Sequence, residues 1–335
     1  MNITVIVCTF NRCEIVAQTL ESVAASVLPE SVQWEVLVVD NNSTDRTKNV
    51  AEDFCRRRPD CFRYIFEPKP GKSSALNAGI RNARSEVLAF LDDDVTVDPA
   101  WLRNLTQPLL DAEYAGVGGR TLLQRPFSPP TWLALYGPGG MGGIIAALFD
   151  LGEEPCDLDQ PPYGVNMAFR RSMFEKYGLF RTDLGPSPSR NIPRPNEDTE
   201  FGRRLLAAGE RLRYEPAAIV YHPVPDNRLQ KSYFLHWWFD FGRAVVVEKG
   251  PRTPVWGIPR HFLSIPKMIA LTLPLCALRW MRTANPQKRF SAKCLTWATA
   301  GQISEAFRMA RTANAAANTP AHDQLRSELP GRLNP

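Results

Sequence analysis

The stretch Val87-Leu88-Ala89-Phe90-Leu91-Asp92-Asp93-Asp94 decides the fold, because a short apolar run leads directly into three acids. Such a run is typical of a strand buried on both faces of a parallel sheet. Open α/β sheets bind ligands at the carboxyl ends of their strands, which is where these carboxylates would lie. Adjacent carboxylates suit a cation such as Mg²⁺ or Mn²⁺, which prefer oxygen ligands. The triplet also fits a solvated turn before a helix that begins near Asp98-Pro99.

Strand and helix patterns alternate over the first 120 residues, which predicts βαβ units and a mostly parallel sheet. The periodicity disappears over 121–162, which is rich in Pro and Gly and which we expect to be a flexible loop. The predicted strands are 3–8, 35–39, 62–66, 86–91, 115–118, 165–170 and 217–221, and the predicted helices are 13–26, 44–57, 73–83, 99–111, 171–177 and 197–208.

Charge divides the chain into an acidic front and a basic back. Residues 1–227 contain 24 Lys/Arg and 30 Asp/Glu, a net charge of −6, whereas 228–335 contain 16 and 5, a net charge of +11. This difference in charge indicates that the two parts of the chain have different functions. We therefore predict an α/β domain over 1–227, a basic helical extension over 228–315 and a polar tail over 316–335.

Cysteine usage and hydropathy bear on where the protein works. The seven cysteines lack framework spacing, which indicates reduced thiols and a cytoplasmic protein. Met1-Asn2 leads directly into a predicted strand, so we expect no signal peptide. The longest apolar run, Met268 to Leu278, contains Pro274 and is shorter than a spanning helix needs.

Polar motifs follow other predicted strands too. Thr9-Phe10-Asn11-Arg12 follows the first strand, Asp40-Asn41-Asn42-Ser43-Thr44-Asp45 follows the second, and Pro70-Gly71-Lys72 precedes the third helix. Lys72 would lie at a helix N-terminus, where it can bind phosphate or remain a solvated charge. Asp40 can accept a hydrogen bond from a nucleotide base or ribose, or can start the turn that follows it.

Four motifs arriving in this order at strand ends resemble the nucleotide-sugar half of family 2 glycosyltransferases, which have the GT-A fold. The resemblance covers about residues 1–225. Two later segments, Tyr163 to Arg170 and Asn196 to Phe201, resemble the family's acceptor-side motifs. The resemblance implies that 1–120 is the nucleotide-sugar-binding half and 163–227 the acceptor half. It also implies inverting transfer of one sugar from a nucleoside-diphosphate sugar, a UDP-sugar by default, to a saccharide or lipid-linked acceptor.

The resemblance also assigns roles to individual residues. Asp94 is expected to bind a divalent cation, Asp92 to bind ribose or a metal-bound water, and His222 to be a further ligand unless it is an ordinary surface histidine. Asp198 is expected to be the general base and Glu197 to position it, although both acids also suit a helix start. The expected donor-binding residues are Thr9, Asn11, Arg12, Asp40, Lys72, Asn77, Asp92 and Asp93, and the expected acceptor-side residues are Gly164 and Asn166.

One departure from the family concerns its processive members, which carry a Q-x-x-R-W motif after the base. The nearest aromatic cluster here is His236-Trp237-Trp238-Phe239, which lacks that Gln/Arg pattern. We therefore expect one sugar to be added per binding event.

Other functions fit parts of the sequence less well. A sugar nucleotidyltransferase needs a Gly-rich loop after the first strand, and Thr9 to Arg12 contains no glycine. An NAD-dependent dehydrogenase needs its glycine fingerprint at the same place, and the match at Gly137 to Gly142 has no strand before it. A non-catalytic nucleotide-sugar-binding protein stays open, although the intact acids favour catalysis.

The C-terminal extension combines positive charge with short apolar stretches. Residues 243–311 contain twelve Lys/Arg and only two acids, Glu248 and Glu305. Such a segment can lie on an anionic membrane surface, or its helices can pack on the α/β domain or on a second subunit. We expect no nucleic-acid partner. The final helix is predicted over 291–312, with Leu295, Ala298, Ile303, Ala306, Phe307 and Ala310 on one face.

Overall fold

The computed structural model describes residues 2–110, 113–137, 139–187, 195–249 and 265–317. Their strands form one mixed sheet in the order β3-β2-β1-β4-β8-β6-β9-β5, and β7 pairs with β9. The first four strands of this order run parallel, as predicted. They are β1 (Asn2–Thr9), β2 (Gln33–Asp40), β3 (Phe62–Phe66) and β4 (Val87–Leu91).

The other half of the sheet is mixed. β8 (Asn166–Arg170) pairs antiparallel with β4 and with β6 (Gly116–Leu123), while β9 (Leu212–His222) runs parallel to β6. The short strands β5 (Thr96–Val97) and β7 (Cys156–Asp157) pair antiparallel with β9. β6 and β9 are longer than predicted, because main-chain pairing continues past their apolar residues.

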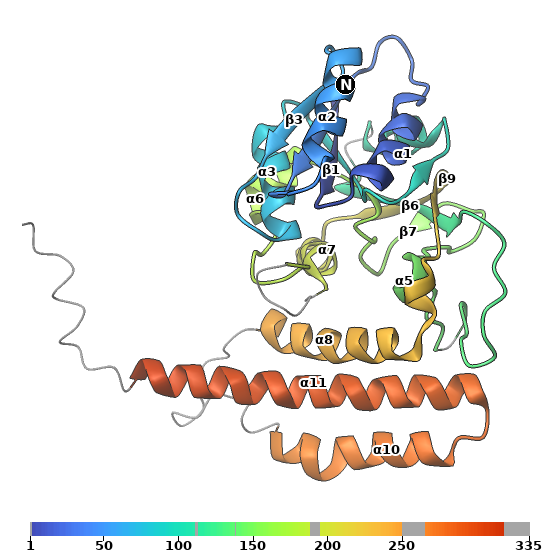
Figure 1. Cartoon of the computed structure of the whole chain (residues 1–335), viewed down its shortest axis with the longest axis vertical. Coiled ribbons are helices and arrows are strands. Elements are labelled where there is room, and N and C mark those ends of the chain that lie inside the picture. The colour runs from blue at the N-terminus through green and yellow to red at the C-terminus, as the bar shows by residue number, and fades with distance from the viewer. Residues whose placement is uncertain (1, 111–112, 138, 188–194, 250–264, 318–335) are drawn as a thin grey trace, which may run out of the picture.

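Helices cover both faces of the sheet (Figure 1). In β4, Val87, Ala89 and Leu91 join one apolar layer, and Leu88 and Phe90 join the other. Burial on both faces explains why this strand is apolar throughout. One layer includes α1 (Cys13–Ala24), α2 (Thr47–Arg57) and α4 (Trp101–Thr106), and the other includes α3 (Lys72–Asn82), α6 (Arg171–Tyr177) and α7 (Glu197–Ala207).

Two predictions for the α/β domain are wrong. The helix predicted over 99–111 ends at Thr106 and continues as the 3₁₀ turn η1 (Gln107–Leu109), where Pro108 lacks the N–H that an α-helix needs. Residues 121–162 contain the end of β6, the short helix α5 (Gly142–Ala146) and β7. Leu133 and Ile145 are fully buried against the C-terminal helices, a partner that no local pattern in 121–162 indicates.

The C-terminal extension is a stack of helices beneath the α/β domain (Figure 1). α8 (Lys231–Lys249) lies nearest the domain, α11 (Pro286–Ala317) packs against α8, and α10 (Leu273–Arg282) lies outermost. Because proline usually breaks a helix, the prolines at 251, 254, 259, 266 and 274 predict breaks in the extension, but Pro266 and Pro274 both lie in helical residues. A π-helical turn, η4 (Met268–Thr272), comes directly before α10. Pro274 lies in the first turn of α10, where a missing N–H costs little. Residues 251, 254 and 259 lie outside the described residues.

Small residues let α8 and α11 approach closely. A Cβ on Gly242 would lie 2.0 Å from the carbonyl oxygen of Ala298, and one on Gly301 would lie 2.0 Å from that of Phe239. The buried Arg243 Nε donates to Glu305 Oε2 across the contact at 2.9 Å. Of the residues predicted to share one face of this helix, Ala298, Ala306 and Ala310 are buried, but Leu295 and Phe307 are exposed because small side chains form this interface.

Candidate active site

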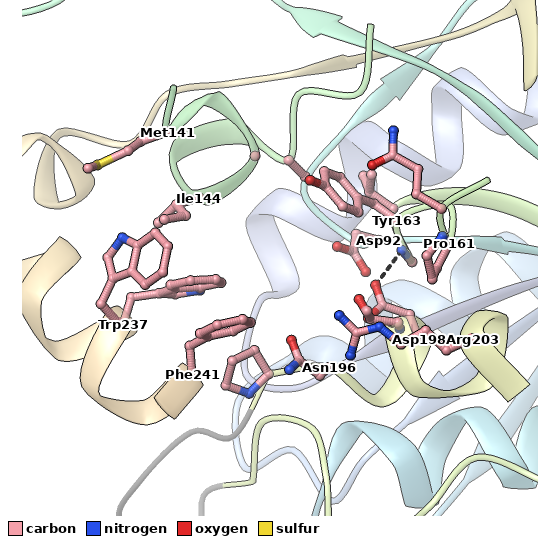
Figure 2. A pocket seen from close by; sticks show the side chains of 18 of the residues that line it. Asp92, Met141, Ile144, Pro161, Tyr163, Asn196, Asp198, Arg203, Trp237 and Phe241 are labelled. Carbon is pink, nitrogen blue, oxygen red and sulfur yellow. Dashed lines mark hydrogen bonds between the residues drawn. The ribbon is translucent and has the colours of Figure 1, made fainter. Parts of the chain in front are cut away.

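Two cavities lie at the carboxyl edge of the parallel strands, and both are lined by Lys72 and Asp92. The triplet cavity, of about 490 Å³, is lined by Thr9, Arg12 and the acids Asp92 to Asp94. The aromatic cavity, of about 670 Å³, lies between α7, α5 and α8 (Figure 2). Strand register explains the first: Val7 pairs with Leu91 and Thr9 with Asp40, so the residues after β1, β2 and β4 meet at one edge.

Each carboxylate of the triplet has a cationic partner. Lys72 Nζ lies 2.6 Å from Asp92 Oδ1, and Arg12 Nη1 lies 2.6 Å from Asp93 Oδ1 and 3.0 Å from Asp94 Oδ2. Burial raises the pKa of Asp93 to about 6, although Arg12 opposes the rise. Burial also acts to raise the pKa of Asp92, but attraction to Lys72 outweighs it and the net shift is downward. The cavity therefore combines buried negative charge with two positive side chains.

His222, at the end of β9, is buried beside the triplet. Its Nδ1 lies 2.6 Å from the carbonyl oxygen of Pro223, an acceptor that places the ring proton on Nδ1. Nε2 then carries the lone pair and lies 3.7 Å from Asp94 Oδ1. Burial lowers the pKa of His222, which favours the neutral ring that a metal ligand requires. Arg228, which the sequence analysis did not single out, lies 3.8 Å from Asp94 Oδ2.

These metal-donor groups suit a divalent cation whose remaining ligands come from a bound substrate. Within the described ranges, no three His, Cys, Asp or Glu side chains gather into a complete metal site. Asp94 and His222 supply two donor groups, with His222 in a suitable tautomer, while Asp92 is paired with Lys72 and one oxygen of Asp94 with Arg12. Mg²⁺ in proteins is typically held by one or two carboxylates plus substrate phosphates, and this incomplete donor set fits that pattern.

Asp198, in the first turn of α7, lines the aromatic cavity and is held by hydrogen bonds. Its Oδ2 accepts from the Gly164 N–H at 2.6 Å, and its Oδ1 accepts from the Thr199 N–H at 2.6 Å. A Cβ on Gly164 would lie 2.9 Å from Asp198 Oδ2, so a side chain here would displace the Asp198 carboxylate. The neighbouring Tyr163 also lines the cavity (Figure 2). The carboxylate is therefore fixed in position at the cavity wall.

Glu197 lies behind Asp198, where its side chain is almost fully buried. Its Oε1 is 3.7 Å from Lys72 Nζ, so Lys72 links Glu197 to Asp92. Burial and the nearby charge of Asp198 raise the pKa of Glu197 to about 7. Burial alone would lower the pKa of Lys72, but attraction to Asp92 and Glu197 raises it above its usual value. Lys72 thus stays charged between the two cavities.

The structure places four predicted site residues in scaffold hydrogen bonds. The Asn77 side-chain amide donates from Nδ2 to the Phe180 carbonyl oxygen and accepts at Oδ1 from the Phe180 N–H. Asn11 Oδ1 accepts from the backbone of the 44–45 turn. Asn166 is buried and bonds the Trp101 indole and two backbone carbonyls. Asp40 accepts from Ser43 N–H and Tyr64 O–H. None of the four lines either cavity as described, so the geometry favours positioning roles over ligand contacts.

Other cavity residues were not predicted from the sequence. Asn41 lines the triplet cavity and ties the loop before α3 to β2, donating to the carbonyl oxygens of Glu67 and Lys69. Trp237, Trp238 and Phe241 of α8 form one wall of the aromatic cavity. The helical spacing of Trp237 and Phe241, four residues apart, is a signal that could have indicated a shared face.

The comparisons agree with this geometry. Residues 4–178 match the model of glycosyl transferase family 2, and the chain belongs to this family. The succinoglycan biosynthesis protein ExoM of Rhizobium meliloti is 30% identical over 234 residues, which are 70% of each chain. The glycosyltransferase AglE of Haloferax volcanii is 27% identical over 277 residues, which are 81% of this chain and 79% of AglE.

Solved structures show the same fold. The mannosyltransferase PcManGT from Pyrobaculum calidifontis, in complex with GDP-Man and Mn²⁺, has a TM-score of 0.58 at 19% identity, covering 90% of this chain and 86% of PcManGT. GalNAc-T7 with UDP, GalNAc and Mn²⁺ has a TM-score of 0.54 at 15% identity, covering 76% of this chain and 52% of GalNAc-T7. The predicted family, GT-A fold and nucleotide-sugar glycosyltransferase class are therefore confirmed.

Proposed function

We propose that this glycosyltransferase moves one sugar, with inversion and with the help of a divalent cation, from a nucleoside-diphosphate sugar to a hydroxyl of a saccharide or lipid-linked acceptor. The donor diphosphate would lie in the triplet cavity, and the acceptor in the aromatic cavity. The observation that carries the proposal is that Lys72 and Asp92 line both cavities, with the fixed carboxylate of Asp198 on the acceptor side.

The transfer is a single displacement. As the acceptor oxygen attacks the anomeric carbon, Asp198 takes the hydroxyl proton, and the bond between that carbon and the diphosphate breaks with its electron pair on the diphosphate. General-base assistance of this kind is worth ~10²–10⁴-fold. A base fixed by two backbone N–H groups keeps its orientation while the substrates bind. Glu197 and Lys72, on the side of Asp198 away from the acceptor, help to hold its carboxylate in place.

Positive side chains would stabilise the leaving diphosphate. Lys72 lies at the N-terminus of α3, where its ammonium and the positive end of the helix dipole can attract phosphate oxygens. Arg12 and Arg228 flank the triplet from the other side. A divalent cation held by Asp94 and His222 would neutralise the developing charge on the diphosphate. Both GDP and UDP occur in the neighbouring structures, and uridine remains the default donor base.

A thermal-shift panel of nucleoside diphosphates with and without Mn²⁺ tests the donor site. A ligand at 100 times its Kd stabilises the folded protein by about 2.7 kcal/mol, so one diphosphate should raise the melting temperature clearly, and more so with Mn²⁺. Asp94→Asn should remove the Mn²⁺-dependent part. A melting temperature that no nucleoside diphosphate changes would reject the proposed function.

We also propose that the extension attaches the enzyme to the cytoplasmic face of an anionic membrane. In the part of the chain that the structure describes, no helix has the length and apolar character needed to cross a bilayer. The helix α10 lies outermost (Figure 1). It exposes Leu275, Leu278 and Met281 beside the cations Arg279 and Arg282. Exposed apolar side chains next to cations suit the surface of a leaflet that holds anionic lipids.

Co-sedimentation with vesicles tests this attachment. We expect binding to anionic vesicles at low salt, weaker binding at high salt and little binding to neutral vesicles. Self-association without vesicle binding would instead assign the exposed face of α10 to a second subunit.

A further inference from the structure

The wall of the aromatic cavity comes from helix α8, which lies outside the residues matched by the family model. Trp237 and Phe241 are stacked, with ring centroids 5.3 Å apart and an interplanar angle of 10°. The Trp238 ring meets Phe241 edge-on at 5.4 Å. Figure 2 shows Trp237 and Phe241 reaching into the cavity from the side opposite Asp198 and Arg203 of α7. The cavity therefore has an aromatic side and a polar side.

Two buried hydrogen-bond donors of this lining lack a protein acceptor. Within the described residues, neither Trp238 Nε1 nor Asn196 Nδ2 has a hydrogen-bond partner, although both atoms are buried. Asn196 also has a φ of 88°, which places it in the left-handed region at the start of α7. Unpaired buried donors are costly, so they indicate a ligand that carries acceptor oxygens.

The charges of the cavity disfavour an anionic ligand at this wall. Arg203 Nη1 lies 2.8 and 2.9 Å from the two carboxylate oxygens of Glu248, and Lys72 is paired with Asp92. Both cations of the lining are thus offset, while Asp159 and Asp198 add two further carboxylates. A phosphate would meet net negative charge here, whereas a neutral ligand with hydroxyl groups would find acceptors.

We infer that the α8 wall is the acceptor subsite and that it binds a neutral saccharide ring, with the apolar C–H face of the sugar packed on Trp237 and Phe241. The sugar oxygens accept hydrogen bonds from Trp238 Nε1 and Asn196 Nδ2, and one hydroxyl faces Asp198. This inference rests on the proposed function and adds to it the chemical class of the group that enters beside the base. An aromatic surface opposite a few polar groups is the usual design of a small-ligand pocket.

The packing of α8 supports a fixed subsite. The close approach at Gly242 and Gly301 and the buried pair of Arg243 and Glu305 hold α8 on α11. The Arg203–Glu248 pair ties α8 to α7, the helix that carries Asp198. A wall held from both sides can orient a sugar ring relative to the base, which makes α8 a determinant of acceptor specificity.

The test is binding of the full chain to an array of neutral oligosaccharides, with a short isoprenyl phosphate as the anionic probe. Trp237→Ala removes the stacking face, and Trp238→Phe keeps a ring but removes the N–H. His236→Ala is the matched control, because His236 is the exposed neighbour on the same helix and lines neither cavity. The melting temperature with and without a nucleoside diphosphate and Mn²⁺ is measured for every variant.

We expect the wild-type chain and His236→Ala to retain at least one neutral oligosaccharide. Trp237→Ala and Trp238→Phe should each weaken that binding about tenfold, the scale of one aromatic contact or one buried hydrogen bond. The stabilisation by nucleoside diphosphate should be unchanged. Retention of no saccharide, equal retention by all variants, or retention of the isoprenyl phosphate alone would overturn the inference. Loss of the nucleotide response in the wild type would instead reject the proposed function.

Discussion

The two cavities that share Lys72 and Asp92 are built in different ways. The triplet cavity gathers mainly residues that follow the neighbouring strands β1, β2 and β4, so strand register brings most of them together. The aromatic cavity gathers α5, α7 and α8, which are far apart in the chain and meet only through packing. The donor side is therefore fixed mainly by strands within the residues that match the family, while the acceptor side depends largely on α7 and α8, which lie outside that match. This difference predicts that donor and acceptor functions can be damaged separately.

The largest expected effect is on the donor side. Asp94→Asn removes one of the two donors proposed for the cation, which stabilises developing charge by several kcal/mol, so turnover should fall by at least ~10²-fold. Mn²⁺ should no longer strengthen nucleoside diphosphate binding in a calorimetric titration. Glu175→Gln, at an exposed position of α6, is the control. Wild-type Mn²⁺ dependence in Asp94→Asn would move the cation elsewhere.

The second prediction concerns the packing that holds the aromatic wall. Arg243→Ala removes one ion-pair partner of the buried carboxylate of Glu305, which also pairs with Arg308, and removing one member of a buried pair costs ~3–5 kcal/mol. Urea unfolding should show a lower midpoint, and saccharide binding should weaken more than nucleotide binding. The double variant Arg243→Met with Glu305→Leu should recover most of the stability. A similar loss of nucleotide and saccharide binding would contradict the view that the two cavities are held in place by different parts of the structure.

The third prediction concerns Glu197, which lies beside Lys72, a residue that lines both cavities. Its pKa of about 7 in the folded protein lies above the ordinary value of 4.5, so the folded state holds a proton that the unfolded state releases. Its contribution to stability is therefore most favourable below pH 4.5 and falls as the pH rises to about 7, by roughly 3 kcal/mol. Glu197→Gln should not show this fall. Parallel pH profiles of unfolding free energy for both proteins would refute the shift.

The smallest effect is expected at the membrane face. Each cation near an anionic surface contributes about 1 kcal/mol, so Arg279→Gln should weaken vesicle binding about fivefold and leave turnover on a soluble acceptor unchanged. Arg56→Gln, a cation exposed on α2, is the control. Equal vesicle binding by both variants would argue against α10 as the attachment face.

The difference between the cavities also explains what the sequence could predict. The segment Val87 to Asp94 predicts a strand and a ligand site, because the run of apolar residues and the acids that follow it are visible in neighbouring residues of the chain. The same reasoning places Lys72 and Asp198 at helix starts, where the structure has them. It fails for Asn77 and Asn166, whose side chains bond distant backbone groups that no local pattern reveals. The aromatic wall is missed for the same reason, since Trp237 lines a cavity only after α8 packs under the domain.

Asp198→Asn with separate measurements of transfer and donor binding tests the central claim most directly. The amide keeps the shape of the carboxylate but cannot take the acceptor proton. We predict that turnover falls by ~10²-fold or more, that the product of the wild type has inverted anomeric configuration, and that nucleoside diphosphate binding with Mn²⁺ is unchanged. Turnover within a few-fold of the wild type, or a product with retained configuration, would contradict Asp198 as the base of a single displacement.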